Sequence, residues 1–466
     1  MKPYEIAANA KPTERQIKWQ QTEFYALISY GMPPFTNKQY GDGFTPATMF
    51  WPEDLSAEEW ALAVKSAGMK AIVLTCKHYD GFCLWPTKYT DYSLKNSNWK
   101  DGNGDIVREV SDACKRNGLK FGVYIAPWDR HEPTYGSGKP YDEFFMNLLR
   151  ELLTDYGDIF CVWLDAVCGA DERNVQDHDW AAYYKLIREL QPDAAICFRG
   201  PDVRWIGNER GVTRESEWSS VPAHLGVYED GTSAKSKSRK SKGVMDLDIG
   251  SRKAIKNEDE FIWYPAECSV PIRDHWFHVA DDKYGIKTKD KLLKLYYRTV
   301  GANCNLMLGL APDKRGRLDE TDLQVLSALG HDLKLYFGYN LAQRDGTVSA
   351  SSEFSKQFAA TNCVDDNEYV YWKPADKDKK PYIEIELKEA DLFDKVVLME
   401  NIRNGQHIEA FEVSYLNEKG KWKKALEGTV VGYKRICCLK PTKTKKIRIT
   451  FTEYRAPVEI LNVAVN

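Results

Sequence analysis

The sequence predicts an α/β fold, in which a (β/α)8-like barrel is followed by an all-β sandwich. The chain has 466 residues, enough for one large domain and a second, smaller one. From about residue 23 to about residue 310, strand-like apolar segments alternate with amphipathic helical segments, which is typical of a parallel barrel. Later segments are short alternating strands without helices between them. We therefore expect the barrel over residues 1–340 and the sandwich over residues 341–466.

The barrel elements follow one another along the chain. Ser56 and Glu59 have the spacing of a capping box at the start of the first main helix. The fifth and sixth strands have no evident helix between them, so we expect an irregular barrel there. Strands are predicted at 23–31, 70–78, 120–128, 159–167, 194–200, 213–219, 261–268 and 303–310, and helices at 56–67, 105–116, 142–156, 179–190, 289–300 and 320–337.

The C-terminal part has the pattern of an antiparallel sandwich. Its predicted strands are 382–387, 395–400, 408–415, 433–439, 446–452 and 459–465. Such a domain could bind sugar or could pack on the barrel as a structural lid. Few exposed aromatic residues are expected in it beyond Trp372 and Trp422, which favours the structural role slightly. The Ser/Lys-rich segment 231–243 could form a basic patch for an anionic substrate, but we expect it to be a solvated loop of the barrel.

Composition and charge exclude several classes of protein. The 65 basic and 68 acidic side chains give a net charge of −3, so neither a nucleic-acid partner nor another polyanion is expected. No apolar run approaches the ~18 residues of a spanning helix, so membrane insertion is not expected. No secretory signal follows Met1, which predicts a cytoplasmic protein as the chain stands, and a periplasmic or secreted one if a signal peptide was removed. The oligomeric state is left open.

Cysteine usage points to a reducing compartment. The chain has 11 cysteines, an odd number, with no Cys-x-x-Cys pair. Several of them lie within strand-like apolar runs, where cysteine acts as a small buried apolar residue. Neither a disulfide framework nor a metal site is therefore expected.

Aromatic and acidic residues gather where the predicted barrel strands end. The chain has 14 Trp, 26 Tyr and 18 Phe, which could be platforms for sugar rings or bulky core residues. Barrel chemistry takes place at the C-terminal ends of the strands. His78 lies at the end of the second strand, Asp165 at the end of the fourth, and Glu209, Glu215 and Glu217 lie around the sixth. No phosphate-binding glycine loop or zinc-type spacing occurs among them.

Carboxylates framed by aromatic rings fit the hydrolysis of glycosidic bonds. One carboxylate attacks or stabilises the sugar cation, and a second protonates the leaving oxygen. Asp165 is the favoured nucleophile because it closes an apolar strand, where an acid is costly without a role, although it could instead cap the following turn. Glu209, Glu215 and Glu217 are equal candidates for the acid/base on these grounds. His78 could equally be a sugar ligand or a core histidine, and no cofactor or metal is expected, since carboxylates suffice.

Six ordered segments together resemble glycoside hydrolase family 29, the α-L-fucosidases, and most of all its α-1,3/1,4-specific subgroup. The resemblance covers essentially the whole chain and implies that the C-terminal sandwich is a discoidin-type, carbohydrate-binding-module-like domain. The segments are 12–16 (PTERQ), 77–82 (KHYDGF), 124–130 (YIAPWDR), 162–165 (VWLD), 204–209 (RWIGNE) and 271–277 (PIRDHWF).

The resemblance implies roles for individual residues. Asp165 matches the nucleophile of a retaining mechanism, and Glu209 in the Gly-Asn-Glu run matches the acid/base. Retention requires the two carboxyl groups to lie roughly 5 to 5.5 Å apart. His78 and Trp128 match positions that contact the sugar. Arg273 and Trp276 are expected to border the same pocket.

Four positions depart from the family pattern. Ser29 stands where the family has a histidine, Gln39 and Tyr40 stand for its Glu-Trp pair, and Tyr79 stands for the second histidine after His78. A neutral Gln39 would lose a charge-assisted hydrogen bond of roughly 1.5 to 3 kcal/mol. These residues are still expected to contact the sugar.

The departures leave more than one hypothesis. The first is an exo-acting retaining α-L-fucosidase that acts on an oligosaccharide or glycan. The second is the same mechanism on a related sugar such as L-galactose or a substituted fucose. The third, a non-catalytic carbohydrate-binding protein, is disfavoured because both carboxylates are present.

Overall fold

The structure is a computed structural model that describes residues 1–165, 175–235, 243–280 and 285–466. Two expectations fall partly outside these ranges: the last two residues of the predicted strand 159–167, and most of the Ser/Lys-rich segment 231–243. Among the residues described, every helix falls short of the length and apolarity that crossing a lipid bilayer takes.

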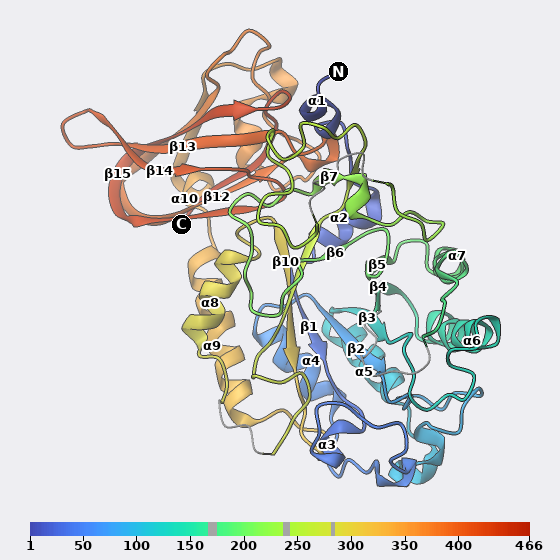
Figure 1. Ribbon diagram of the computed structural model, residues 1–466. Coiled ribbons are helices and arrows are strands. Elements are labelled where there is room, and N and C mark those ends of the chain that lie inside the picture. The colour runs from blue at the N-terminus through green and yellow to red at the C-terminus, as the bar shows by residue number, and fades with distance from the viewer. Residues whose placement is uncertain (166–174, 236–242, 281–284) are drawn as a thin grey trace.

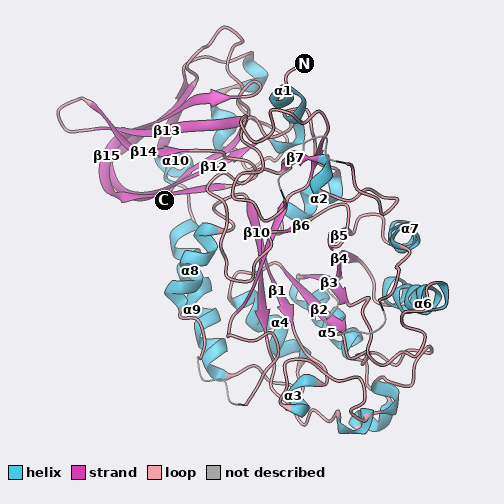
Figure 2. Cartoon of the chain, in the orientation of Figure 1, coloured by secondary structure: helices cyan, strands magenta, loops and turns pink. Residues whose placement is uncertain are grey.

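The N-terminal part is the predicted parallel barrel (Figures 1 and 2). One sheet of eight strands has the order β5-β4-β3-β2-β1-β10-β9-β6. A single bridge between Cys197 and Val203 joins its two edges, so the barrel is nearly closed. The strands are β1 (Phe24–Ile28), β2 (Ala71–Lys77), β3 (Lys120–Ile125), β4 (Ile159–Leu164), β5 (Ala195–Phe198), β6 (Arg204–Trp205), β9 (Ala266–Pro271) and β10 (Cys304–Leu310).

Two of the strand predictions are wrong. Segment 213–219 is not a strand, and the sixth strand of the barrel is β6, two residues long. Residues 213–219 contain buried charged side chains, held by ion pairs, that do not fit a barrel strand. The predicted strand 261–268 is divided at Pro265: β8 (Phe261–Trp263) pairs antiparallel with β7 (Ser220–Pro222) in a separate sheet, and β9 begins at Ala266. Proline lacks the N–H that a continuous strand would use.

The predicted helices are present along the outside of the barrel. Ser56 caps the first of them by accepting a bond from the N–H of Glu59 (3.2 Å). The carboxylate of Glu59 binds Arg317 instead of closing a capping box, so that detail of the prediction is wrong. The helices are α4 (Ala57–Ser66), α5 (Ile106–Asn117), α6 (Lys139–Asp155), α7 (Trp180–Leu190), α8 (Lys289–Arg298) and α9 (Glu320–Phe337).

Shorter helices complete the chain. α1 (Pro3–Ala7) and α2 (Glu14–Gln20) precede the barrel, α3 (Pro33–Thr36) follows β1, and α10 (Leu341–Asp345) leads into the C-terminal domain. The 3-10 turns are η1 (Ala47–Met49), η2 (Leu94–Asn96), η3 (Trp99–Gly102), η4 (Ala223–Leu225), η5 (Lys356–Phe358), η6 (Ala360–Val364) and η7 (Ile402–Asn404).

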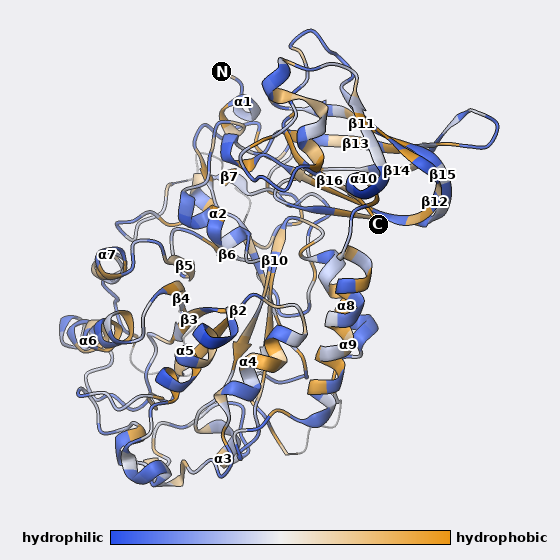
Figure 3. Ribbon diagram, turned by 180° about the vertical axis from the view of Figure 1, so that it is seen from behind, coloured by the Kyte–Doolittle hydropathy of each residue, from blue (hydrophilic) through white to orange (hydrophobic). Residues whose placement is uncertain are grey.

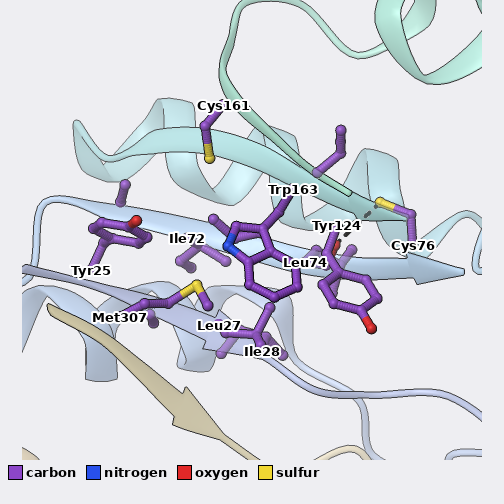
Figure 4. Close-up of a cluster of buried hydrophobic side chains, with 14 of the residues drawn as sticks. Tyr25, Leu27, Ile28, Ile72, Leu74, Cys76, Tyr124, Cys161, Trp163 and Met307 are labelled. Carbon is purple, nitrogen blue, oxygen red and sulfur yellow. Dashed lines mark hydrogen bonds between the residues drawn. The ribbon is translucent and has the colours of Figure 1, made fainter. Parts of the chain in front are cut away.

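The barrel interior is packed with apolar side chains. Figure 4 shows Trp163 in the middle of this cluster, with Met307 and Leu27 on one side and Tyr124 on the other. All four are buried. Figure 3 shows the same distribution along the backbone, with β10 coloured as apolar inside the barrel and the surrounding helices mixed. The floor of any cavity at the strand ends is therefore a dense apolar layer.

The C-terminal domain is the predicted all-β unit. Its strands are antiparallel, in the order β11-β12-β15-β13-β14, with β16 paired to β12. β12 and β15 each merge two predicted strands, and their pairing register shifts after Glu386 and after Phe393, between the two halves of β12. The strands β11 and β14 were not predicted. The bounds are β11 (Gly346–Ala350), β12 (Tyr382–Glu400), β13 (Ile408–Leu416), β14 (Trp422–Gly428), β15 (Arg435–Tyr454) and β16 (Ile460–Val465).

The two tryptophans of this domain are engaged within it. Trp372 is fully buried. The guanidinium of Arg448 lies 4.1 Å from the centre of the Trp422 ring and 4.4 Å from that of Tyr382, so it covers the Trp422 face. The domain packs on the end of the barrel where the strands begin, next to α1 (Figure 1), and the N–H of Asn303 donates to Lys434 O there.

Candidate active site

A cavity of about 340 Å³ opens where the barrel strands end. Its base is the apolar layer around Trp163, and its upper wall is made by loops that follow β1, β2, β3 and β6. Among the described residues, the lining is mostly aromatic and includes two carboxylates: Leu27, Ser29, Tyr40, Thr75, His78, Tyr79, Tyr124, Trp128, Arg130, Trp163, Asp165, Phe198, Trp205, Glu209, Ser269, Trp276, Phe277 and Met307.

Asp165 lies directly after β4, in the wall of the cavity, and its side chain is buried. Two phenols donate to the same carboxylate oxygen, Oδ2: Tyr124 at 2.5 Å, and Tyr79. Burial and then the charge of Asp165 raise the pKa of Tyr124 well above its usual value, and the pKa of Tyr79 rises for the same reasons. Both phenols therefore stay protonated, which keeps the Asp165 carboxylate in one orientation.

Glu209 lies in the loop after β6, at the mouth of the same cavity. The Asn208 side chain shapes this loop: its Oδ1 accepts from the N–H groups of Arg210 (3.1 Å) and Val212 (3.0 Å), and its Nδ2 donates to Val212 O (2.8 Å). Gly207, at a φ of 92°, makes the turn out of the strand. The Glu209 carboxylate is exposed at the end of a short, internally bonded turn.

Tyr40 lines the same cavity as the two carboxylates. Burial raises the pKa of Tyr40, and the charges of Glu209 and then Asp165 raise it further. Both carboxylates thus lie within electrostatic reach of one phenol at the mouth of the cavity. A bound molecule beside Tyr40 would face both of them.

The other two acid/base candidates lie elsewhere. Glu215 is exposed and does not line the cavity. Glu217 is fully buried, where Arg204 and Arg214 bind its carboxylate. Of the three glutamates that composition alone could not separate, Glu209 lines the cavity and the other two do not.

Within the part of the chain that the structure describes, two polar atoms in the cavity wall have no hydrogen-bond partner. Nδ1 of His78 and Nε1 of Trp128 are buried and make no hydrogen bond in the structure. Burial, and then the charges of Lys77 and Arg130, lower the pKa of His78 to about 3, so the imidazole is neutral at ordinary pH. Buried polar atoms are rarely left unpaired, and both of these belong to residues that line the cavity. They fit hydrogen bonds to the hydroxyl groups of a ligand.

The remaining predicted site residues divide into two groups. Ser29 and Trp276 line the cavity, but Gln39 and Arg273 do not. The Gln39 side chain donates to Phe277 O (2.9 Å) and accepts from the N–H of Trp276 (3.2 Å). Arg273 pairs with the buried Asp322 (2.7 Å). Both residues therefore hold the loop that carries Trp276 and Phe277.

Sequence reasoning missed several residues of the cavity wall. Tyr124 is one of them, whereas Trp163 belongs to the tryptophans that the sequence places in or beside the strand-end motifs. Trp163 lies two residues before Asp165, and alternation along a strand could have placed both on the same face. No local signal marks Phe198, Ser269 or Met307, which come from strands distant in the chain.

A buried carboxyl lies beneath the cavity floor. Glu267 accepts hydrogen bonds from Nε1 of Trp163 (2.7 Å) and from the hydroxyl of Tyr25. Burial raises its pKa to about 7, against 4.5 for an ordinary glutamate. Glu267 therefore fixes the orientation of the Trp163 ring and is protonated in mildly acidic solution.

This pKa predicts a pH dependence of stability. Between pH 4.5 and 7 folded Glu267 keeps a proton that the unfolded chain releases, so the contribution of Glu267 to the free energy of unfolding falls as the pH rises through this range. Glu267→Gln mimics the protonated acid and should lack this loss. Urea unfolding at pH 4.5 and 8 should show the variant gaining roughly 3 kcal/mol on the unmodified protein at the higher pH. A difference that does not change with pH would contradict the assignment.

Within residues 1–165, 175–235, 243–280 and 285–466, no three His, Cys, Asp or Glu side chains are grouped so that they could hold an ion.

Comparison with known proteins places both parts of the chain. The family model for Alpha-L-fucosidase matches residues 7–337, and the model for the F5/8 type C domain matches residues 347–464. Alpha-L-fucosidase 1 of Arabidopsis thaliana is 35% identical over 443 residues, which are 94% of this chain and 83% of that protein.

Solved structures agree with the family models. A GH29 fucosidase of Ruminococcus gnavus in complex with fucose aligns with a TM-score of 0.86 and 29% identity, over 98% of this chain and 95% of that one. A glycoside hydrolase 29 family member from an unknown rumen bacterium aligns with a TM-score of 0.80 and 32% identity, over 98% and 77% of the two chains.

Proposed function

Because the chain belongs to the α-L-fucosidase family of glycoside hydrolases, we propose that it removes terminal α-L-fucose from oligosaccharides or glycoconjugates with retention of configuration. Asp165 is the proposed nucleophile and Glu209 the proposed acid/base. The single observation that carries the proposal is that these two carboxylates share one aromatic cavity, whereas Glu215 and Glu217 do not reach it.

The proposed reaction has two displacements. In the first, the Asp165 carboxylate attacks the anomeric carbon while Glu209 gives its proton to the glycosidic oxygen, so the bond to the leaving group breaks. In the second, Glu209 takes a proton from water, the water oxygen attacks the same carbon, and Asp165 leaves. Tyr79 and Tyr124 keep the attacking carboxylate in place throughout.

The cavity supports an exo mode of action. Its base is closed by Leu27, Trp163 and Met307, so a terminal sugar can enter but a chain cannot pass through. The unpaired His78 Nδ1 and Trp128 Nε1 are the proposed hydrogen-bonding partners of sugar hydroxyls. The preference for α-1,3/1,4-linked branches is proposed from the resemblance of the six segments to that subgroup.

The mechanism is tested by the configuration of the first product. With an aryl α-L-fucoside as substrate, proton NMR at early times should show α-L-fucose, because two inversions at one carbon restore the original configuration. The slow conversion of this product to the β form by mutarotation in water, seen in the same spectra, shows that the first anomer was observed before equilibration. Release of β-L-fucose first would exclude a nucleophile role for Asp165.

A second candidate keeps the mechanism and changes the sugar. Ser29, Tyr40 and Tyr79 depart from the family pattern and line the cavity, so they would face a substituent of the sugar. The aryl α-glycosides of L-fucose and L-galactose decide between the two. A higher kcat/KM on the L-galactoside would favour the second candidate, and a preference for the fucoside would remove it.

A further inference from the structure

The loop that carries Glu209 has an arginine at each end, and both arginines bind one carboxylate. Arg204 precedes the loop on β6, and Arg214 follows it. Arg204 Nη2 bonds to Oε1 of Glu217, and Arg214 Nη1 bonds to Oε2 at 3.0 Å. The three side chains are at most 5% exposed. Glu217 therefore joins the two ends of the loop in a buried ion-pair cluster.

Each arginine is also bonded to the backbone around it. Arg204 donates to Tyr264 O (2.9 Å) and Trp218 O (2.8 Å). Arg214 donates to Asp246 O (2.7 Å). Because these bonds use the fixed directions of the guanidinium group, the base of the loop has little freedom to shift.

The C-terminal domain holds the same cluster from the other side. Gln406, fully buried, accepts from the N–H of Ser219 (2.7 Å) and donates to Glu217 O (3.1 Å). Asn303 of the barrel donates to the same carbonyl at 2.9 Å. The backbone of 217–219 is thus fastened by a side chain that belongs to the other domain.

We infer that Glu217 and Gln406 are positioning residues for the acid/base, through which docking of the C-terminal domain holds the Glu209 loop in place. The inference rests on the proposed role of Glu209. A general acid must lie within hydrogen-bond reach of the glycosidic oxygen, and a displacement of about 1 Å can cost about 10²-fold in rate. A loop with both ends fixed is suited to that requirement.

The dependence of kcat/KM on the leaving group distinguishes a displaced acid/base from a general loss of stability. A substrate with a good leaving group, such as a dinitrophenyl fucoside, needs little proton donation, whereas a methyl fucoside needs it fully. A displaced acid lowers kcat/KM on the methyl fucoside far more. A variant that is only partly folded loses the same factor on both substrates.

The experiment compares variants of the full chain on these two fucosides. Gln406→Leu removes the hydrogen bonds to Ser219, Glu217 and Asn303, and we expect the ratio of kcat/KM between the good and the poor substrate to rise about tenfold. Arg252→Ala is the matched control, because Arg252 bonds to Glu409 and Tyr454 O in the same domain contact but does not touch Glu217. Its ratio should equal that of the unmodified protein.

Two more variants, Glu217→Gln and Glu209→Gln, distinguish a failure of the positioning inference from a failure of the acid/base assignment. Glu217→Gln should raise the ratio further, and thermal unfolding shows whether this buried substitution is tolerated; if it is not, Gln406→Leu alone decides. An unchanged ratio in Gln406→Leu would overturn the inference. Glu209→Gln is the reference: if it leaves the ratio unchanged, the acid/base assignment fails instead.

Discussion

Replacement of Asp165 by Ala should lower kcat on an aryl α-L-fucoside by about 10⁴-fold or more. The side chain lies in the cavity wall with two phenols donating to it, and among the lining residues that the structure describes Glu209 is the one other carboxylate. Binding of fucose should survive, since His78 and Trp128 remain. Single-turnover kinetics and fucose titration measure the two effects separately.

Rescue by a small anion is the control for this variant. Azide can occupy the space left by the carboxylate and attack the anomeric carbon once, which gives a fucosyl azide of inverted configuration. Recovery of turnover with azide would show that the fold and the acid/base are intact. Undiminished turnover of the Asp165→Ala variant in plain buffer would disprove the nucleophile assignment.

Glu209→Gln should lower kcat/KM about 10²- to 10⁴-fold on substrates with poor leaving groups. Gln has nearly the same shape but cannot donate a proton to the departing oxygen or take one from water. On a dinitrophenyl fucoside the first step needs no acid, so the glycosyl-enzyme should accumulate and show a burst of released phenol. Stopped-flow absorbance measures that burst.

The matched control for Glu209 is Glu215→Gln. Glu215 lies six residues further on, is exposed and does not line the cavity. Its kcat/KM on both kinds of substrate should stay within twofold of the unmodified protein, about 0.4 kcal/mol. The reverse pattern, with Glu215→Gln inactive and Glu209→Gln active, would move the acid/base to Glu215.

Much of the fold could be predicted because most helices and strands show their pattern of apolar and polar residues within a short stretch of sequence. Strands such as β2 and β10 are largely apolar segments between helices, which is typical of strands buried on both faces. β6 could not be found this way, since two residues show no period. The prediction of a strand at 213–219 was wrong. Its buried charged side chains form ion pairs with residues that the sequence alone does not identify.

The site was predictable where chemistry coincides with a strand end. Asp165 and His78 follow apolar strands directly, so their position in the sequence predicts that they lie at the C-terminal end of the barrel. Gln39 and Arg273 came from resemblance alone, and in the structure their side chains bond to the neighbouring loop and to Asp322. Glu217 looked equal to Glu209 because charge and spacing do not reveal which carboxylate meets a buried arginine.

The contact between Gln406 and the backbone of 217–219 bears on how such proteins can be recombined. A chimera that joins this barrel to the C-terminal domain of a relative would preserve each fold. It would, however, replace Gln406 while keeping the backbone of 217–219 to which Gln406 is hydrogen-bonded. We expect functional chimeras to need residues 217–219, Asn303 and Gln406 to be inherited together. The two domains would then have to be exchanged together, although their sequence patterns change abruptly at the boundary between them.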